Sequence, residues 1–261
     1  MQIPDGKKIY FLSDFHLGAP DHETSLAREK RIVKFLQDIL PETAVLFIVG
    51  DMFDFWYEYR SVVPKGYTRI LGALAAFTDQ GIPVHFFVGN HDMWMNDYFK
   101  KELNIDVYFE PAEFEFNGKK MLVGHGDGLG PGDYGYKRLK KIFRNPLCQW
   151  LFGMLPPAIG VGTANYFSKR SRAVTGENDG KYLGEEGEWL IQYCKRKLME
   201  QSYDYLIFGH RHLPIDFTFD NGARYVNLGD WIRYYTYAVF EDTQVKLLSY
   251  YVELDHKIIR K

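Results

Sequence analysis

Five short apolar runs in this chain each end at a cluster of glycine, serine, aspartate, asparagine or histidine. The runs are Ile9–Leu12, Ala44–Val49, Val84–Val88, Met121–Val123 and Tyr205–Phe208. Short continuous apolar runs are typical of strands that are buried on both faces. Helix-like segments at 24–40 and 67–78, with apolar residues at helical spacing, separate the first three runs. The first half is therefore predicted to alternate strand and helix.

The second half changes character. Residues 114–120 read as a hairpin turn that leads into the Met121 strand. From about Asp204 onward strand patterns dominate, at 205–208, 215–219, 224–227, 237–240 and 245–252. Strands that alternate with helices and are followed by strands alone predict a layered α/β or α+β sandwich.

Composition narrows the class of protein. The 261 residues are 46% hydrophobic and 25% charged, with a formal net charge of -2, which is typical of a globular chain and gives no sign of nucleic-acid binding. The two cysteines, Cys148 and Cys194, are expected to be free thiols in a reducing compartment. The N-terminus lacks signal-peptide order, and no apolar run reaches the roughly 18 to 20 residues of a membrane span. We therefore expect a cytoplasmic protein.

One segment has an unusual charge balance. Residues 134–176 contain no acidic side chain, and they carry basic clusters on both sides of the apolar stretch Pro146–Val161. Basic residues that flank an apolar stretch suit a membrane interface or an amphiphilic ligand. A core helix with solvated basic ends is the alternative.

The clusters that follow the apolar runs hold the candidate chemistry. Five of the eight histidines lie in them, and they can be listed as Asp14 and His16, Asp51, Asn90 with His91 and Asp92, His125, and His210 with His212. Residues two apart, such as Asp14 and His16, would share one face if the strand continued. Carboxylate, amide and imidazole ligands without a thiol suit manganese, iron or zinc. We predict a site for two metal ions, in which Asp51 could bridge.

The sequence resembles the calcineurin-like metallophosphoesterase superfamily in the order of its motifs. These motifs are Asp-x-His, Gly-Asp-x-x-Asp, Gly-Asn-His-Asp, Gly-His and Gly-His-x-His. The resemblance implies a four-layer sandwich of two mixed β-sheets flanked by helices. It implies one metal bound by Asp14, His16, Asp51 and His212, and a second bound by Asp51, Asn90, His125 and His210. His91 would contact the phosphate or protonate the leaving group. Asp92 would orient His91.

A narrower resemblance is to the UDP-2,3-diacylglucosamine pyrophosphatases of lipid A biosynthesis. It is carried by Ser13–Leu17, Gly50–Trp56, His125–Leu129 and Asp133–Tyr136. It implies a helical lid at 131–176 that receives acyl chains, within a core of 1–130 and 177–261. The residues expected to contact substrate are Asn90, His91, Asp133, Tyr136, Ser171, Arg172, Thr175 and His210. Known members have arginine where this chain has His91, and the lid contacts could equally be surface polar residues or helix caps.

The resemblance implies cleavage of UDP-2,3-diacylglucosamine to UMP and 2,3-diacylglucosamine 1-phosphate. It implies two divalent ions, with manganese favoured over iron or zinc. An acylated nucleotide sugar and the cytoplasmic face of the inner membrane are the expected partners, without nucleic acid or an obligate protein partner. The alternatives are a phosphoesterase with another lipid-linked or small substrate and a non-catalytic scaffold. The aromatic residues at 53–59 could stack on uracil or a sugar, or belong to the core.

Overall fold

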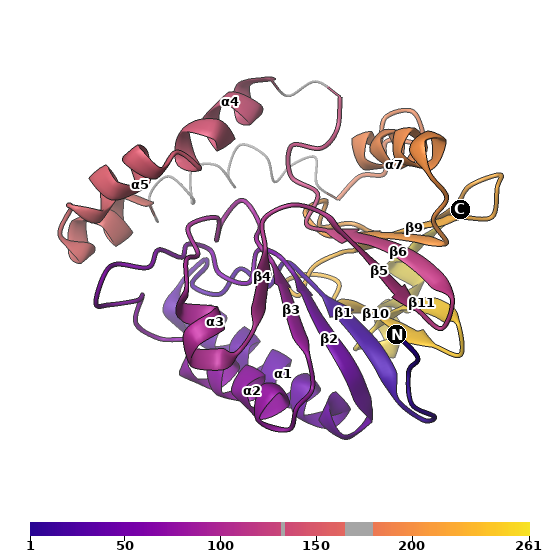
Figure 1. Ribbon diagram of the computed structural model, residues 1–261, viewed down its shortest axis with the longest axis horizontal. Helices are drawn as coiled ribbons and strands as arrows, with labels where there is room; N and C mark the ends of the chain where they lie inside the picture. The colour runs from indigo at the N-terminus through magenta and orange to yellow at the C-terminus, as the bar shows by residue number, and fades with distance from the viewer. Residues whose placement is uncertain (132–133, 165–179) are drawn as a thin grey trace.

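The first of two mixed β-sheets carries most of the N-terminal half. The computed structural model describes residues 1–131, 134–164 and 180–261. The sheet has the strand order β11-β10-β1-β2-β3-β4 (Figure 1). Strands β1 to β4 are parallel, and β10 and β11 add as antiparallel neighbours. The strand bounds are Lys8–Leu12 (β1), Thr43–Val49 (β2), Val84–Phe87 (β3), Asp106–Tyr108 (β4), Thr236–Glu241 (β10) and Gln244–Ser249 (β11).

The second sheet has the order β12-β8-β9-β7-β6-β5, and it also mixes parallel and antiparallel pairs. Its strands are Ala112–Phe116 (β5), Lys119–Gly124 (β6), Tyr205–Phe208 (β7), Pro214–Thr218 (β8), Arg224–Leu228 (β9) and Ile259–Arg260 (β12). The two sheets face one another across an apolar layer that includes Phe11, Phe47, Val123, Ile207 and Val226.

Helices cover the outer faces of both sheets. Helices α1 (His22–Ile39), α2 (Thr68–Asp79) and α3 (Tyr98–Leu103) lie against the first sheet, and α7 (Trp189–Glu200) lies against the second (Figure 1). Two short 3-10 helices, η1 (Leu40–Glu42) and η2 (Val252–Lys257), also belong to this sandwich. This arrangement confirms the predicted sandwich of two mixed sheets flanked by helices.

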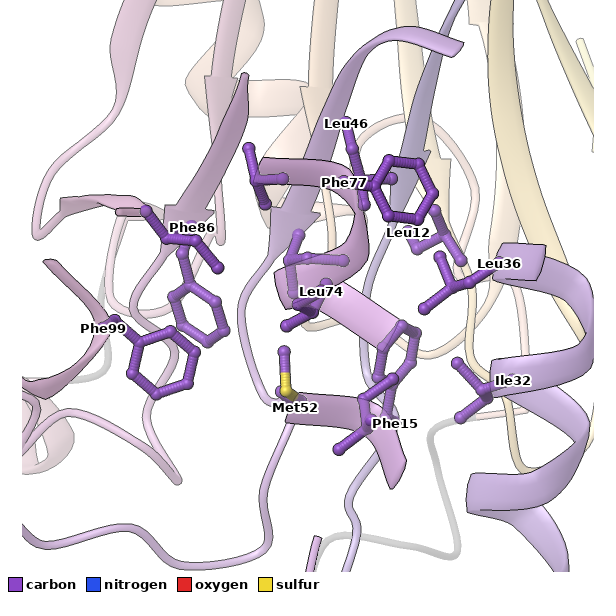
Figure 2. Packing of buried hydrophobic residues seen from close by; sticks show 14 of the residues in the cluster. Leu12, Phe15, Ile32, Leu36, Leu46, Met52, Leu74, Phe77, Phe86 and Phe99 are labelled. Carbon is purple, nitrogen blue, oxygen red and sulfur yellow. The ribbon is translucent and has the colours of Figure 1, made fainter. Parts of the chain in front are cut away.

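The α1–α2 layer is fixed by both capping and apolar packing. The Asp21 carboxylate accepts the Thr24 N–H at 2.8 Å, which satisfies a free amide at the start of α1. Glu29 accepts the backbone N–H groups of Arg69 and Ile70, so α1 supplies the missing partners at the start of α2. Figure 2 shows the apolar side chains beneath these helices, where Leu74 points toward the sheet and Met52.

Helices α4 (Tyr134–Phe143) and α5 (Pro146–Gly153) extend away from the sandwich (Figure 1). Residues 157–164 are also helical. Neither α4 nor α5 contains a buried residue, so the interpretation of this stretch as a core helix does not hold for its described part. Within the described ranges, no helix is long and apolar enough to cross a bilayer.

Helix α5 rests on four aromatic side chains, Phe55, Tyr57, Tyr59 and Trp94, which we call the aromatic bed. Each ring lies within 6.5 Å, centroid to centroid, of Phe152 on α5. The Tyr57 hydroxyl donates to the Gln149 carbonyl of α5, and the Trp94 indole donates to the Phe143 carbonyl of α4. In contrast, Phe53 and Trp56 are fully buried in the core. The aromatic run at 53–59 is thus divided between core and support for α5.

Candidate metal centre

The predicted ligand residues converge at the C-terminal ends of five parallel strands, β1, β2, β3, β6 and β7. Asp14 follows β1 and His125 follows β6, so both sheets contribute. The Asp14 N–H donates to the Gly50 carbonyl, and the His210 N–H donates to Asp14 Oδ2 at 3.0 Å. The second bond joins the two sheets directly at the site. Strand ends that meet at one edge are the usual location of sites in such folds.

The first group comprises Asp14, His16, Asp51 and His212. Their ligand atoms all lie within 4.8 Å of one another. His16 Nε2 is 3.1 Å from His212 Nε2 and 3.7 Å from Asp51 Oδ2. His212 Nε2 is 3.2 Å from Asp14 Oδ1. Four ligand atoms from three separate segments therefore surround one point.

The second group comprises Asp51, His125 and His210, also within 4.8 Å. His125 Nε2 lies 3.3 Å from Asp51 Oδ2, and its Nδ1 is held by the Val49 carbonyl at 2.8 Å. Because a carbonyl only accepts, Nδ1 carries the proton and Nε2 faces the carboxylate. Asp51 belongs to both groups, which is the position expected of a bridging ligand.

Unsatisfied polar atoms show that the site fits metal ions. Among the described residues, Asp14 Oδ1, Asn90 Oδ1 and His125 Nε2 are buried atoms without a hydrogen-bond partner. Buried polar groups normally have hydrogen-bond partners, and a buried group without a partner costs about 1–3 kcal/mol. Carboxylate, amide and imidazole donors suit hard-to-borderline divalent ions. The clustered site is therefore suited to divalent metals.

The ligand-bearing residues have an unusual backbone. Asp14, His16, Asp51, His210 and His212 have φ of 56°, 45°, 52°, 66° and 54°, in the left-handed region. The strands end before them, so the expected shared strand face of Asp14 and His16 does not explain their convergence. Each side chain is instead directed by a left-handed residue that lies beyond the end of a strand. Such strained conformations cost about 1–3 kcal/mol each and cluster at functional sites.

Glycines next to the ligands permit close approach. A Cβ at Gly209 would lie 2.6 Å from Asp14 Oδ2, and one at Gly89 would collide with the Asp51 carboxylate. A Cβ at Gly50 would collide with Nδ1 of the His125 ring. These positions require glycine because backbone and ligand occupy the same small volume.

His91 lies at the rim of the first group. Its N–H donates to Asp51 Oδ1, and its ring Nδ1 contacts the Asp54 carbonyl oxygen at 3.0 Å and the Asp54 carboxylate at 3.7 Å. Asp92, which was expected to orient the ring, instead accepts the backbone N–H groups of Met52 and Gly89. Asp54 thus takes the place predicted for Asp92, because the Asp92 side chain turns inward to tie two ligand loops together.

Burial and neighbouring charges shift the pKa values of the site residues in opposite directions. Burial alone lowers the pKa of His125, but the Asp51 carboxylate outweighs it and raises this pKa to about 10. Burial raises the pKa of Asp51, yet the surrounding imidazoles hold it well below its usual value. Burial lowers the pKa of His91 and of His210 to about 4. At neutral pH the Asp51 carboxylate is thus ionised and the His210 ring neutral, whereas the His125 ring carries a second proton that a metal ion would have to displace.

Several residues that support the metal ligands carry no signal of this role in the sequence. Arg28 is buried on α1, and its guanidinium donates to the carbonyls of Phe15 and His16 at 3.0 and 2.9 Å. Asp230 Oδ2 lies 3.7 Å from His212 Nδ1. Metal-binding histidines commonly have such carboxylate partners on their second nitrogen. Arg28 lies within an ordinary amphipathic helix pattern, so no local motif could have identified it.

Only some of the residues expected to contact substrate lie within the described ranges. The Tyr136 hydroxyl donates to Asp127 Oδ2 at 2.6 Å, and Lys140 Nζ lies 2.6 Å from the same oxygen. These contacts bind α4 to the loop that carries His125. Four other predicted positions lie outside the described residues, namely Asp133, Ser171, Arg172 and Thr175.

Comparison with known proteins adds to this geometry. Residues 7–214 match the family model described as calcineurin-like phosphoesterase. A UDP-2,3-diacylglucosamine hydrolase of Porphyromonas gingivalis is 40% identical, over 93% of this chain and 97% of that protein. Proteins of the same name from Aeromonas hydrophila and Ectopseudomonas mendocina are 29% and 30% identical. They cover 85% and 86% of this chain, and 89% and 90% of their own lengths.

Proposed function

Because this chain belongs to the calcineurin-like phosphoesterase family, we propose that it is a dinuclear-metal hydrolase that cleaves the pyrophosphate of UDP-2,3-diacylglucosamine. Water would add to the UMP phosphorus, and the bond to the sugar 1-phosphate would break. The products would be UMP and 2,3-diacylglucosamine 1-phosphate. The observation that carries this proposal is a site suited to two metals beside helices that expose an apolar surface. The name and coverage of the 40% identical relative support it.

The residues of the site would divide the metals between them. Asp14, His16 and His212 would hold one ion, and His125 and His210 the other, with Asp51 bridging. The buried Asn90 Oδ1, which has no hydrogen-bond partner, would join the second ion. We favour manganese as the native ion, and iron or zinc would also suit these carboxylate, amide and imidazole donors. When bound, the ions would activate water near neutral pH and neutralise phosphate charge.

His91 is proposed to stabilise the charge that develops on the attacked phosphate. The Asp54 carbonyl at 3.0 Å fixes the Nδ1 side of its ring, so Nε2 is the nitrogen that would face the phosphate. A sugar 1-phosphate is an acidic leaving group, so strong general-acid assistance is unnecessary. Without substrate the pKa of His91 is about 4, so Nε2 carries no proton there. An anionic phosphate beside the ring would raise that pKa, and the protonated ring would then act mainly by electrostatic stabilisation. Asp92 would hold the two ligand loops in register.

We further propose that 131–176 forms a lid over this site, inserted into a core of 1–130 and 177–261. Helix α5 exposes Leu147, Trp150 and Leu151, and α4 exposes Leu139 and Ile142. Such surfaces can take up acyl chains and rest on a bilayer interface.

Basic residues complete this amphipathic surface. Arg138 and Lys141 are exposed on α4, next in sequence to the apolar Leu139 and Ile142. Their positive charge favours anionic headgroups and phosphate. We therefore propose a peripheral protein on the cytoplasmic face of the inner membrane that meets an acylated nucleotide sugar there, without nucleic acid or an obligate protein partner. Tyr136, Asn90, His91 and His210 remain proposed substrate contacts, as do Asp133, Ser171, Arg172 and Thr175.

A substrate panel tests the reaction. Purified protein with manganese should release UMP from UDP-2,3-diacylglucosamine, and it should turn over the non-acylated nucleotide sugar much more slowly. Mass spectrometry of products formed in ¹⁸O-labelled water should place the label on UMP. Cleavage of small phosphoesters with the acylated substrate left intact would identify a different phosphoesterase. Failure to hydrolyse any substrate would favour a non-catalytic scaffold.

A further inference from the structure

We propose that the start of α7, residues Glu188, Trp189 and Leu190, is a positioning element for the metal site that contains His125 and His210. This inference rests on the proposed division of ligands. The three residues are consecutive, and each contacts a different part of the two loops that carry these histidines. We call them the α7 wedge.

Glu188 makes a buried ion pair with Arg211, the residue between His210 and His212. The carboxylate is fully buried and the guanidinium is nearly so. Arg211 Nε donates to Glu188 Oε2 at 3.0 Å, and Nη2 donates to Oε1 at 3.2 Å. A paired fork of this kind fixes direction as well as distance. The side chain of Arg211 therefore faces away from the metals and holds the loop from behind.

The same pair reaches the chain that returns from the proposed lid. Arg211 Nη2 donates to the Lys181 carbonyl at 2.6 Å, and Glu188 Oε1 accepts the Leu183 N–H at 3.0 Å. Both partners thus engage the segment that leads into α7. The ligand loop and this returning segment are held by one buried charge pair.

Trp189 contacts the ligand itself. Its ring meets the His210 ring edge to face, with centroids 5.5 Å apart at 74°. On its other side a Cβ at Gly130 would lie 2.6 Å from the indole ring, so the ring fills the space between the two loops. Aromatic pairs in this geometry are favourable beyond their burial. The indole therefore limits rotation of the His210 imidazole.

Leu190 completes the contact at the opposite loop. It is buried, and a Cβ at Gly126 would lie 3.2 Å from Leu190 Cδ1. Gly126 directly follows His125, whose ring lies 5.1 Å from that of His210. The wedge thus sets the spacing of these two imidazoles. His212 has other support, from Asp14 and Asp230, so the wedge should act on one metal site more than on the other.

The test is a manganese titration of metal-free protein, with free Mn²⁺ followed by electron paramagnetic resonance. Glu188→Gln keeps the shape of the side chain and removes its charge. Changing a partner that supports a metal ligand typically costs about 10- to 100-fold in affinity. We expect that loss at one site and less than about 3-fold at the other. Glu186→Gln is the matched control, because its exposed carboxylate on the same segment pairs only with the surface residue Lys195 among the described contacts.

Glu188→Gln is repeated in two variants that each lack one metal site, which identifies the site that it affects. His125→Ala leaves the site of His16 and His212, and there Glu188→Gln should change the remaining affinity little. In His212→Ala, which leaves the other site, the same change should weaken the remaining binding by about 10- to 100-fold. Equal losses in both backgrounds, or no loss in either, would overturn the proposal.

A second variant covers the case in which Glu188→Gln fails to fold. Trp189→Leu leaves the ion pair and removes the ring from His210, and it should weaken the same site. Circular dichroism of the metal-free variants checks folding. Full affinity at both sites in folded Trp189→Leu would refute the role of the wedge. These titrations contain no substrate, so a wrong substrate assignment would leave their outcome unchanged.

Discussion

The Nε2 atoms of His16 and His212 face each other at 3.1 Å, although the residues are 196 positions apart in the chain. Asp14 and Asp51 oxygens lie 3.7–3.8 Å from the same nitrogen of His16. Two ring nitrogens at this separation, with two carboxylate oxygens beside them, can bind one divalent cation.

His212→Ala should therefore weaken binding of one metal ion. We expect a loss in affinity of more than about 100-fold, since even residues outside the ligand set cost 10- to 100-fold. Isothermal titration calorimetry of the metal-free protein with Mn²⁺ measures this. His256→Ala removes an exposed histidine outside the site and should leave two ions bound. Two tight ions in His212→Ala would remove His212 from the ligand set.

Metal binding should release protons. The pKa of His125 is raised from 6.5 to about 10, so its ring is protonated at pH 7 without metal, and a cation must displace that proton. Affinity should rise with pH until it levels off near pH 10, by up to about tenfold per unit for one proton. Calorimetry in buffers of different ionisation enthalpy counts the protons released. A count of zero at pH 7 would contradict this protonation state.

The same group makes the metal-free protein less stable at high pH. A raised pKa in the folded state means that folding retains a proton, so the stabilisation is complete below about pH 6.5 and is lost as pH rises through about 10. Urea unfolding of metal-free protein at several pH values should show this decline. His125→Gln should flatten it, and a decline of equal slope in that variant would assign the effect to another group.

His91→Ala should lower kcat while both metals remain bound. Loss of one group that stabilises developing charge typically costs about 10²- to 10³-fold. Arginine would place a positive charge beside the phosphate, so His91→Arg should retain more activity than His91→Ala. Steady-state kinetics with metal content measured in parallel separates the two effects. Loss of a metal in His91→Ala would show that the ring supports the ligands instead.

Replacing apolar residues on α5 should affect only acylated substrate. Trp150→Ser exposes no core, because this side chain is 61% exposed. Burial of a large apolar side chain contributes about 1.5–3 kcal/mol, so KM for the diacyl substrate should rise about tenfold or more. Met199→Ser alters an exposed apolar residue on α7 and is the matched control. An equal change in KM for the non-acylated nucleotide sugar would argue against contact with acyl chains.

Leu74→Ala should destabilise the α1–α2 layer. Leu74 is fully buried between α2 and the first sheet (Figure 2), and truncation of such a residue costs about 2–5 kcal/mol. Urea unfolding measures the change in free energy. Met199→Ala, at an exposed position, should stay within about 0.5 kcal/mol.

The residues that follow the strands were the most predictable part of this site. Local patterns place Asp14, Asp51 and His210 after apolar runs, and strand ends must meet at one edge. The support around them was not predictable, because it depends on contacts distant in sequence. Arg28 and Glu188 lie in ordinary helical patterns. The family resemblance implied that Asp92 orients His91, yet its carboxylate accepts the backbone N–H groups of Met52 and Gly89.

Small elements were also missed, for physical reasons. The three residues of β4 and the two of β12 are too short to show periodicity, and β12 exists only because Ile259 pairs with Ile215. Helix α7 presents apolar and basic residues without a clear cap at Glu188, whose side chain is committed to Arg211. The basic clusters and the apolar stretch within 134–176 suggested an amphipathic surface. In the described part of this segment, α4 exposes Leu139 and Ile142 beside Arg138 and Lys141.

The left-handed backbone at five of the ligand positions has an evolutionary consequence. Apart from glycine, the residue types that most readily adopt this conformation are asparagine, aspartate and histidine, which are also metal ligands. The backbone conformation and the chemistry of metal binding therefore favour the same few amino-acid types. If a descendant of this chain lost its dependence on metal, these positions should drift toward glycine, because that change relieves strain. A decayed copy would be recognisable by glycines at positions 14, 16, 51, 210 and 212.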